Sequence, residues 1–151
     1  MGGSRRPEST ETMHSEHLQN VKLGWVFFGW FVALSVSSSL VLVLISGGLL
    51  AHSSTSADLL VAGSVAFGWF LGGFFTCYRT AAAPILHGSA IALFTFVAWF
   101  ILNLVLGGFT TGLEAWEEIS FPGATIALLI QGVAAIAGSW VGYRYAPVRV
   151  P

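Results

Sequence analysis

Charged residues are scarce in this chain. Its 151 residues include six Lys and Arg and seven Asp and Glu, so 9% are charged, against about 25% in soluble domains. Backbone phosphate binding needs a clustered basic surface, and six Lys and Arg in all are too few for one, so we expect no nucleic-acid partner. With 55% hydrophobic residues, the composition indicates that water is not the main solvent of the protein.

Cysteine and recognisable catalytic patterns are also nearly absent. The single Cys77 excludes an internal disulfide and any zinc site with several cysteine ligands. The sequence contains no nucleophile–base pair, phosphate-binding loop or haem-ligand pattern that we can recognise. We therefore expect a protein that is not an enzyme and that holds no metal or other cofactor.

No Asp, Glu, Lys or Arg lies inside the long apolar stretches, where such a residue usually marks a proton or ion path. The polar side chains there are neutral, and the most informative are Ser35, Ser38, Asn103 and Gln131. Two interpretations stay open for them. They form hydrogen bonds between helices, or they line a cavity.

The apolar stretches themselves predict an all-α polytopic membrane protein, a bundle of four transmembrane helices within a domain at 21–146. The expected spans are about 23–46, 59–77, 85–106 and 124–142. At 1.5 Å per residue each is about long enough to cross a hydrocarbon core of about 30 Å. Gly47-Gly48 should end the first span, and Pro84 suits the first turn of the third.

The remaining segments are polar and short. Residues 1–20 lack the apolar surface needed to offset the entropy of ordering, so we expect a disordered tail, with a second tail at 147–151. All six Lys and Arg residues fall on one side of the four-span scheme: Arg5, Arg6, Lys22, Arg79, Arg144 and Arg149. Because cytoplasmic segments retain Lys and Arg, both termini should be cytoplasmic.

Aromatic and cationic pairs end two of the spans on that same side. Tyr78-Arg79 and Tyr143-Arg144 are typical of anchors at a membrane interface. His87, one turn into the third span, is expected near this interface. It either has its hydrogen bonds satisfied there, or titrates, binds a lipid headgroup or meets Arg79.

Small residues recur every fourth position in two spans. The second span carries Ser64, Gly68, Gly72 and Thr76, and the fourth carries Ala134, Gly138 and Gly142. Helices associate in lipid through such small-residue faces, so these stripes predict that the second and fourth spans touch. Packing within one bundle and docking to a partner or a second copy are both compatible with the stripes.

A weak internal similarity appears when the sequence is shifted by 65 residues. The shift places Gly73–Arg79 over Gly138–Arg144 and Phe31–Ala33 over Phe96–Ala98. This pattern favours either two parallel-repeat hairpins or shared chemistry at helix ends.

Three motifs together carry a family resemblance: Gly72–Arg79, Leu86-His87-Gly88 and the small-residue run that ends at Gly138–Arg144. The region from the first span to Arg144 resembles a group of small four-span prokaryotic membrane proteins of unknown function, with Pro84-Ile85 in place of the Gly-Trp of that group. The resemblance implies a four-helix protein of the prokaryotic plasma membrane and no substrate.

Three functions are compatible with these features. The leading hypothesis is a non-enzymatic accessory or scaffold subunit that packs through its small-residue faces against another membrane protein or itself. One alternative is a small oligomeric transporter or channel lined by the serines of the first span with Asn103 and Gln131. The other is lipid or pigment binding in a groove walled by Trp25, Trp30, Trp69 and Trp99. Membrane lipids are expected partners in every case.

Overall fold

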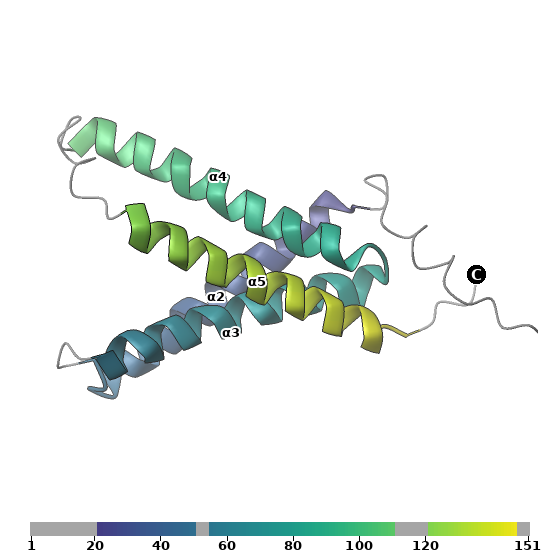
Figure 1. Cartoon of the computed structure of the whole chain (residues 1–151), viewed down its shortest axis with the longest axis horizontal. Helices are drawn as coiled ribbons and strands as arrows, with labels where there is room; N and C mark the ends of the chain where they lie inside the picture. The colour runs from purple at the N-terminus through teal and green to yellow at the C-terminus, as the bar shows by residue number, and fades with distance from the viewer. Residues whose placement is uncertain (1–20, 51–54, 111–120, 148–151) are drawn as a thin grey trace, which may run out of the picture.

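The structure is a computed structural model that describes residues 21–50, 55–110 and 121–147. These residues form four α-helices and no strand, which confirms the all-α prediction (Figure 1). The helices are α2 (Leu23–Ser46), α3 (Thr55–Thr80), α4 (Pro84–Thr110) and α5 (Phe121–Tyr145). All four are long and apolar enough to cross a membrane. The predicted tail at 1–20, most of the one at 147–151, and Glu114, Glu117 and Glu118 lie outside the described residues.

The helices follow the apolar stretches but extend beyond most of them. α2 covers the same residues as the first predicted span, whereas α3 begins four residues before residue 59 and ends three after residue 77. Polar residues at the ends of α3, such as Asp58 and Arg79, belong to the helix. Side-chain polarity marks where the apolar length ends, while backbone hydrogen bonding continues until a residue interrupts it.

Glycine and proline set two of the boundaries. Gly48, with φ +70, follows the C-cap of α2, and the Leu49 and Gly48 N–H groups donate to the Leu44 and Ile45 carbonyls, a Schellman motif. Pro84 opens α4, as the sequence predicts. The turn before it contains two non-glycine residues with positive φ, Ala81 and Ala83.

The four helices converge at one end of the molecule and separate at the other (Figure 1). At the closed end, defined by Lys22, Thr80, Pro84 and Tyr145, the helices pack together. At the open end, defined by Ser46, Asp58 and Gly123, α2 and α3 stay paired and diverge from the α4–α5 pair. α3 packs extensively on both α2 and α5, α4 packs mainly on α5, and α2 has little contact with α4.

The core is small and lies where the pairs meet. Its buried residues are Val26, Ala33, Trp69, Ile91 and Ala135. Trp30 packs against this cluster, edge-on to Phe94 at 5.0 Å between ring centroids. Trp69 is thus a core residue and Trp30 packs against the core, so neither has its ring free for the ligand groove expected from sequence.

The small-residue stripe of α3 faces α2. A Cβ at Gly68 would lie 2.8 Å from the Ala33 carbonyl oxygen, and one at Gly72 would collide with Gly29. The Thr76 hydroxyl, fully buried, shares its single proton between the Gly72 carbonyl oxygen of its own helix at 2.9 Å and the Trp25 carbonyl oxygen of α2 at 3.2 Å. Lack of side chains lets these two backbones approach closely.

The second and fourth spans touch as predicted, but through a different face of α3. A Cβ at Gly138 would collide with the Phe70 backbone, one at Gly142 with Phe74, and one at Gly73 with Ala135. Two other stripe residues are peripheral to these crossings. Ala134 packs partly buried against the core, and the Ser64 hydroxyl donates to the Leu60 carbonyl of its own helix at 2.8 Å.

The two hairpins cross at different positions along their helices. α4 meets α5 where Gly88 faces Ile136. If the hairpins were repeats shifted by 65 residues, the equivalent contact in the first hairpin would join Leu23 of α2 to Leu71 of α3. α2 instead crosses α3 at Gly29 and Gly72. The repeat therefore stays a prediction from sequence.

Candidate functional site

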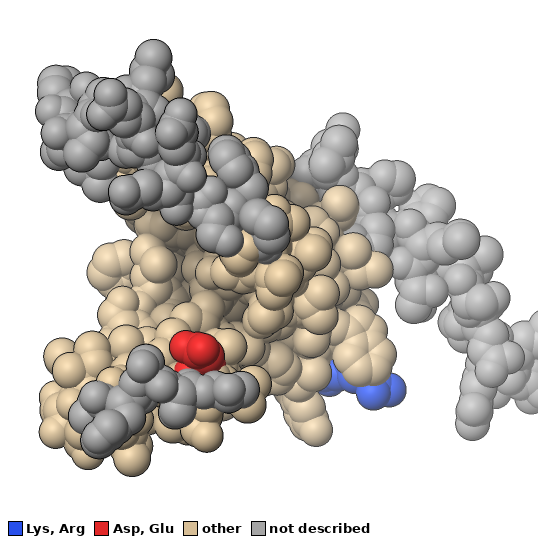
Figure 2. Space-filling model, turned by 60° about the vertical axis from the view of Figure 1, so that its left-hand side comes forward, with Lys and Arg blue, Asp and Glu red and all other residues tan. Residues whose placement is uncertain are grey.

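A cleft opens between α3 and α5 at the open end of the bundle, and it encloses about 590 Å³. Its walls are Asp58, Val61, Ala62 and Val65 of α3 and Gly123, Ile126, Ala127, Ile130 and Gln131 of α5. We call it the α3/α5 cleft. Figure 2 shows the molecule hollowed between its two arms, with acidic surface beside the hollow and basic surface at the opposite end.

The cleft exists because its two walls pack on different helices, α3 on α2 and α5 on α4. The half of α3 nearer the open end is held on α2, where Gly68 meets Ala33 and the Ser37 hydroxyl donates to the Val65 carbonyl oxygen at 3.4 Å. α5 is held on α4, where a Cβ at Gly132 would lie 3.4 Å from the Ala92 Cβ. Once past Gly73 and Gly138, α3 and α5 therefore diverge.

Gln131 places a polar atom among the apolar walls. Its Oε1 is buried and has no hydrogen-bond partner, although its side chain as a whole is only partly buried. An unmatched buried acceptor costs about 1–3 kcal/mol. This atom is therefore available to a ligand or partner that donates a hydrogen bond.

Asp58 supplies the acidic group of the cleft. It is exposed, lies in the first turn of α3, and is the one carboxylate side chain among the described residues. A negative charge is favourable at a helix N-terminus by about 0.3–1 kcal/mol. Local helix stabilisation therefore accounts for the presence of Asp58, but not for its position on the wall of a cleft.

The other polar residues singled out in the sequence do not join Gln131. Ser35 and Ser38 are exposed on α2, and the Ser35 carbonyl accepts a hydrogen bond from the Ser39 hydroxyl at 2.7 Å. The Asn103 amide donates to the Trp99 carbonyl oxygen at 2.8 Å, within its own helix. Of the set predicted for a channel, Gln131 lines the α3/α5 cleft, whereas Ser35, Ser38 and Asn103 are absent from its lining.

His87 is fully buried at the closed end. The Lys22 backbone N–H donates to His87 Nε2 at 3.2 Å, so this nitrogen is unprotonated, and Nδ1 donates to the Ala83 carbonyl oxygen at 2.9 Å. The imidazole thereby joins the start of α2 to the turn before α4. Both ring nitrogens therefore have hydrogen-bond partners within the chain. Among the predicted alternatives, this favours a histidine that supports the fold over one that binds a lipid headgroup.

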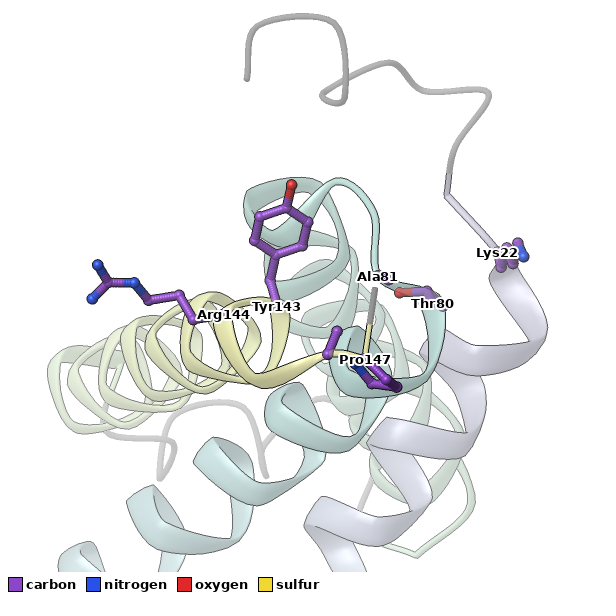
Figure 3. Close-up of a pocket in the computed structure, with 7 residues that line it drawn as sticks. Lys22, Thr80, Ala81, Tyr143, Arg144 and Pro147 are labelled. Carbon is purple, nitrogen blue, oxygen red and sulfur yellow. The ribbon is translucent and has the colours of Figure 1, made fainter. Parts of the chain in front are cut away.

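The predicted anchor residues also lie at the closed end. The Arg79 guanidinium is 5.5 Å from the Trp25 ring centroid, and that of Arg144 is 4.5 Å from the Trp140 ring centroid. Tyr78 stacks on Phe74, and Tyr143 lines a hollow of about 600 Å³ with Thr80 and Pro147. In Figure 3, Lys22 and Arg144 lie on opposite sides of this hollow, and the Arg144 side chain extends away from it. Its two cations therefore do not converge on a common ligand.

Most residues of the α3/α5 cleft were not identified from sequence. Gln131 was identified from sequence, because a single amide side chain stands out in an apolar stretch. Ala62, Ile126 and Ala127 resemble every other apolar residue of their helices, and only the divergence of α3 and α5 distinguishes them. In the described part of the chain, no three His, Cys, Asp or Glu side chains cluster as metal ligands would.

Comparison with known proteins adds no relative: no family model, curated protein or solved structure matches this chain. The resemblance to small four-span prokaryotic membrane proteins thus stays a prediction from short motifs.

Proposed function

We propose that this chain is a non-enzymatic integral membrane protein that acts as an accessory or scaffold subunit by receiving a partner's transmembrane helix in the α3/α5 cleft. We further propose that it resides in a prokaryotic plasma membrane with both termini cytoplasmic, which places the cleft in the outer half of the bilayer. The observation that carries the docking proposal is the apolar, open cleft that forms where α3 and α5, packed on each other at the closed end, diverge toward α2 and α4.

The glycine stripes are not the docking surface. Gly68, Gly72, Gly138 and Gly142 are all buried, and each faces a neighbouring helix of the same chain. Because these glycine faces are already occupied by helices of the same chain, we propose that the partner binds in the cleft and not on the glycine stripes. Polypeptide partners other than a helix are disfavoured at this depth, since lipid offers no hydrogen bonds to irregular backbone.

The cleft walls suit a helix better than a lipid chain. Ala62, Gly123 and Ala127 are small, and small residues let a second backbone approach closely, which a flexible acyl chain does not require. The lining on α5 runs from Gly123 to Gln131, nine residues with a rise of about 12 Å, so it is a little over two helical turns deep. One face of a partner helix fits a slot of this length.

Filling the cleft tests the proposal. The double variant Ala62→Leu/Ala127→Leu should reduce recovery of the stoichiometric partner roughly tenfold, a loss equivalent to about 1.4 kcal/mol. The measurement is quantitative mass spectrometry of proteins that co-purify with the affinity-tagged full chain from native membranes in mild detergent. Gly63→Leu is the matched control, because Gly63 is exposed next to Ala62 and a Cβ there has no atom within 4 Å.

The outcomes separate clearly. Partner loss in the cleft variant and retention in the Gly63→Leu control support docking in the cleft. Equal recovery in both variants contradicts it, and so does a wild-type protein that purifies without any stoichiometric partner. The latter result would favour the transport hypothesis, which a liposome flux assay then tests.

A further inference from the structure

We infer that the helix received by the α3/α5 cleft carries two polar groups on one face: a hydrogen-bond donor that meets Gln131 and a basic side chain that meets Asp58. This inference rests on the proposed function and specifies the chemistry of the partner.

Gln131 defines the requirement for a donor. Its buried Oε1 can only accept a hydrogen bond, and no described group of the chain donates to it. The neighbouring cleft residues Ile130, Ala127 and Val65 have apolar side chains. A partner helix with Ser, Thr, Asn, Gln, Tyr or Trp at this depth would satisfy the acceptor, whereas an acyl chain would leave it unmatched.

Asp58 defines the requirement for a cation. The described cations, Lys22, Arg79 and Arg144, lie at the closed end, so no described group of opposite charge shares the open end with Asp58 (Figure 2). A partner that enters from the open end therefore meets an uncompensated negative charge. A Lys or Arg near the end of its helix is complementary and can keep its charged group at the interface.

The geometry also sets the spacing of the two groups. α3 and α5 both run from the open end to the closed end, with Asp58 and Gly123 near the mouth of the cleft and Val65 and Gln131 deeper. The depth of about 12 Å corresponds to about two turns of helix. Residues about seven positions apart lie on one helix face, so a basic residue and a donor at this spacing would reach Asp58 and Gln131 together.

A second copy of this chain does not meet these requirements. In the same orientation, a second copy carries its described cations at the closed end, away from Asp58. The inference therefore specifies a different membrane protein as the partner.

Site-specific photocrosslinking tests the inference on the full chain in its native membrane. A benzophenone amino acid placed at Ile126, a cleft residue whose side chain is already large and exposed, should capture an apolar helix, and sequencing of the crosslinked peptide should show a Lys or Arg about seven residues from a hydrogen-bond donor. Asp58→Asn and Gln131→Leu should each lower the yield roughly three- to tenfold. Asn103→Leu, which removes an amide outside the cleft, should not, and the probe at Gly63 should capture lipid.

Folding is measured separately, by the unfolding midpoint of each variant in detergent. Gln131→Leu removes an unmatched acceptor, so its midpoint should equal or exceed that of the wild type. A variant with a lower crosslinking yield but an unchanged unfolding midpoint is then impaired in docking and not in folding.

The other outcomes distinguish the inference from the proposed function. Capture of a helix that lacks the two polar groups, capture of a second copy, or a yield that neither substitution changes overturns the inference and leaves docking in the cleft standing. Capture of lipid alone at Ile126 overturns both.

Discussion

The two ends of the bundle differ in how their polar groups are used. At the closed end, His87 is satisfied on both ring nitrogens, Thr76 joins α3 to α2, and the described arginines stack on tryptophans. At the open end, Gln131 Oε1 is unmatched and Asp58 stands beside an apolar cleft. Ser139 Oγ and Trp30 Nε1 are also buried without a hydrogen-bond partner, but neither lines the cleft. The open end therefore differs in that an unmatched acceptor and a carboxylate lie on the walls of one apolar hollow.

The largest expected effect is at the closed half, where backbones are in contact. Gly138→Leu should destabilise the protein by about 3 kcal/mol or more, because even its Cβ would collide with the Phe70 backbone, which cannot move as a flexible side chain would. Gly63→Leu serves as the control and should change stability by no more than about 0.5 kcal/mol. Reversible unfolding in mixed micelles measures both. Equal stabilities would show that α3 and α5 do not cross at Gly138.

A smaller effect is expected for the imidazole bridge. His87→Leu should cost about 1–3 kcal/mol, because it leaves the Lys22 N–H and the Ala83 carbonyl without this partner. His87→Gln, whose side-chain oxygen can accept from Lys22, should lose less. The same unfolding assay checks the order of the variants. A Leu variant as stable as the wild type would remove His87 from the set of groups that hold the closed end.

The smallest effect is expected for the neutral polar residues outside the cleft. Ser35→Ala and Asn103→Leu should each change stability by no more than about 0.5 kcal/mol and leave partner recovery unchanged, since Ser35 is exposed and the Asn103 amide bonds only within α4. Loss of the partner in either variant would place the binding surface outside the α3/α5 cleft.

Prediction from sequence succeeded where the signal is carried by a stretch of residues. The all-α class, four helices long and apolar enough to cross a membrane, and the start of α4 at Pro84 follow from apolar length and from proline chemistry. Prediction from sequence was less successful at identifying which helices pack on each other. The stripe of Gly68 and Gly72 shows that α3 has a close neighbour, but glycine carries no information on which helix that is.

What the sequence alone determined is therefore the kind of element: helices of about transmembrane length, poor in charge, with cations segregated from Asp58. Only the tertiary structure decided that the α3 stripe faces α2, that Gly73 and Gly138 join α3 to α5, and that the two walls of the cleft diverge. The physical reason is that hydrogen bonding within a helix is local, whereas the choice of neighbour depends on how all four surfaces fit together.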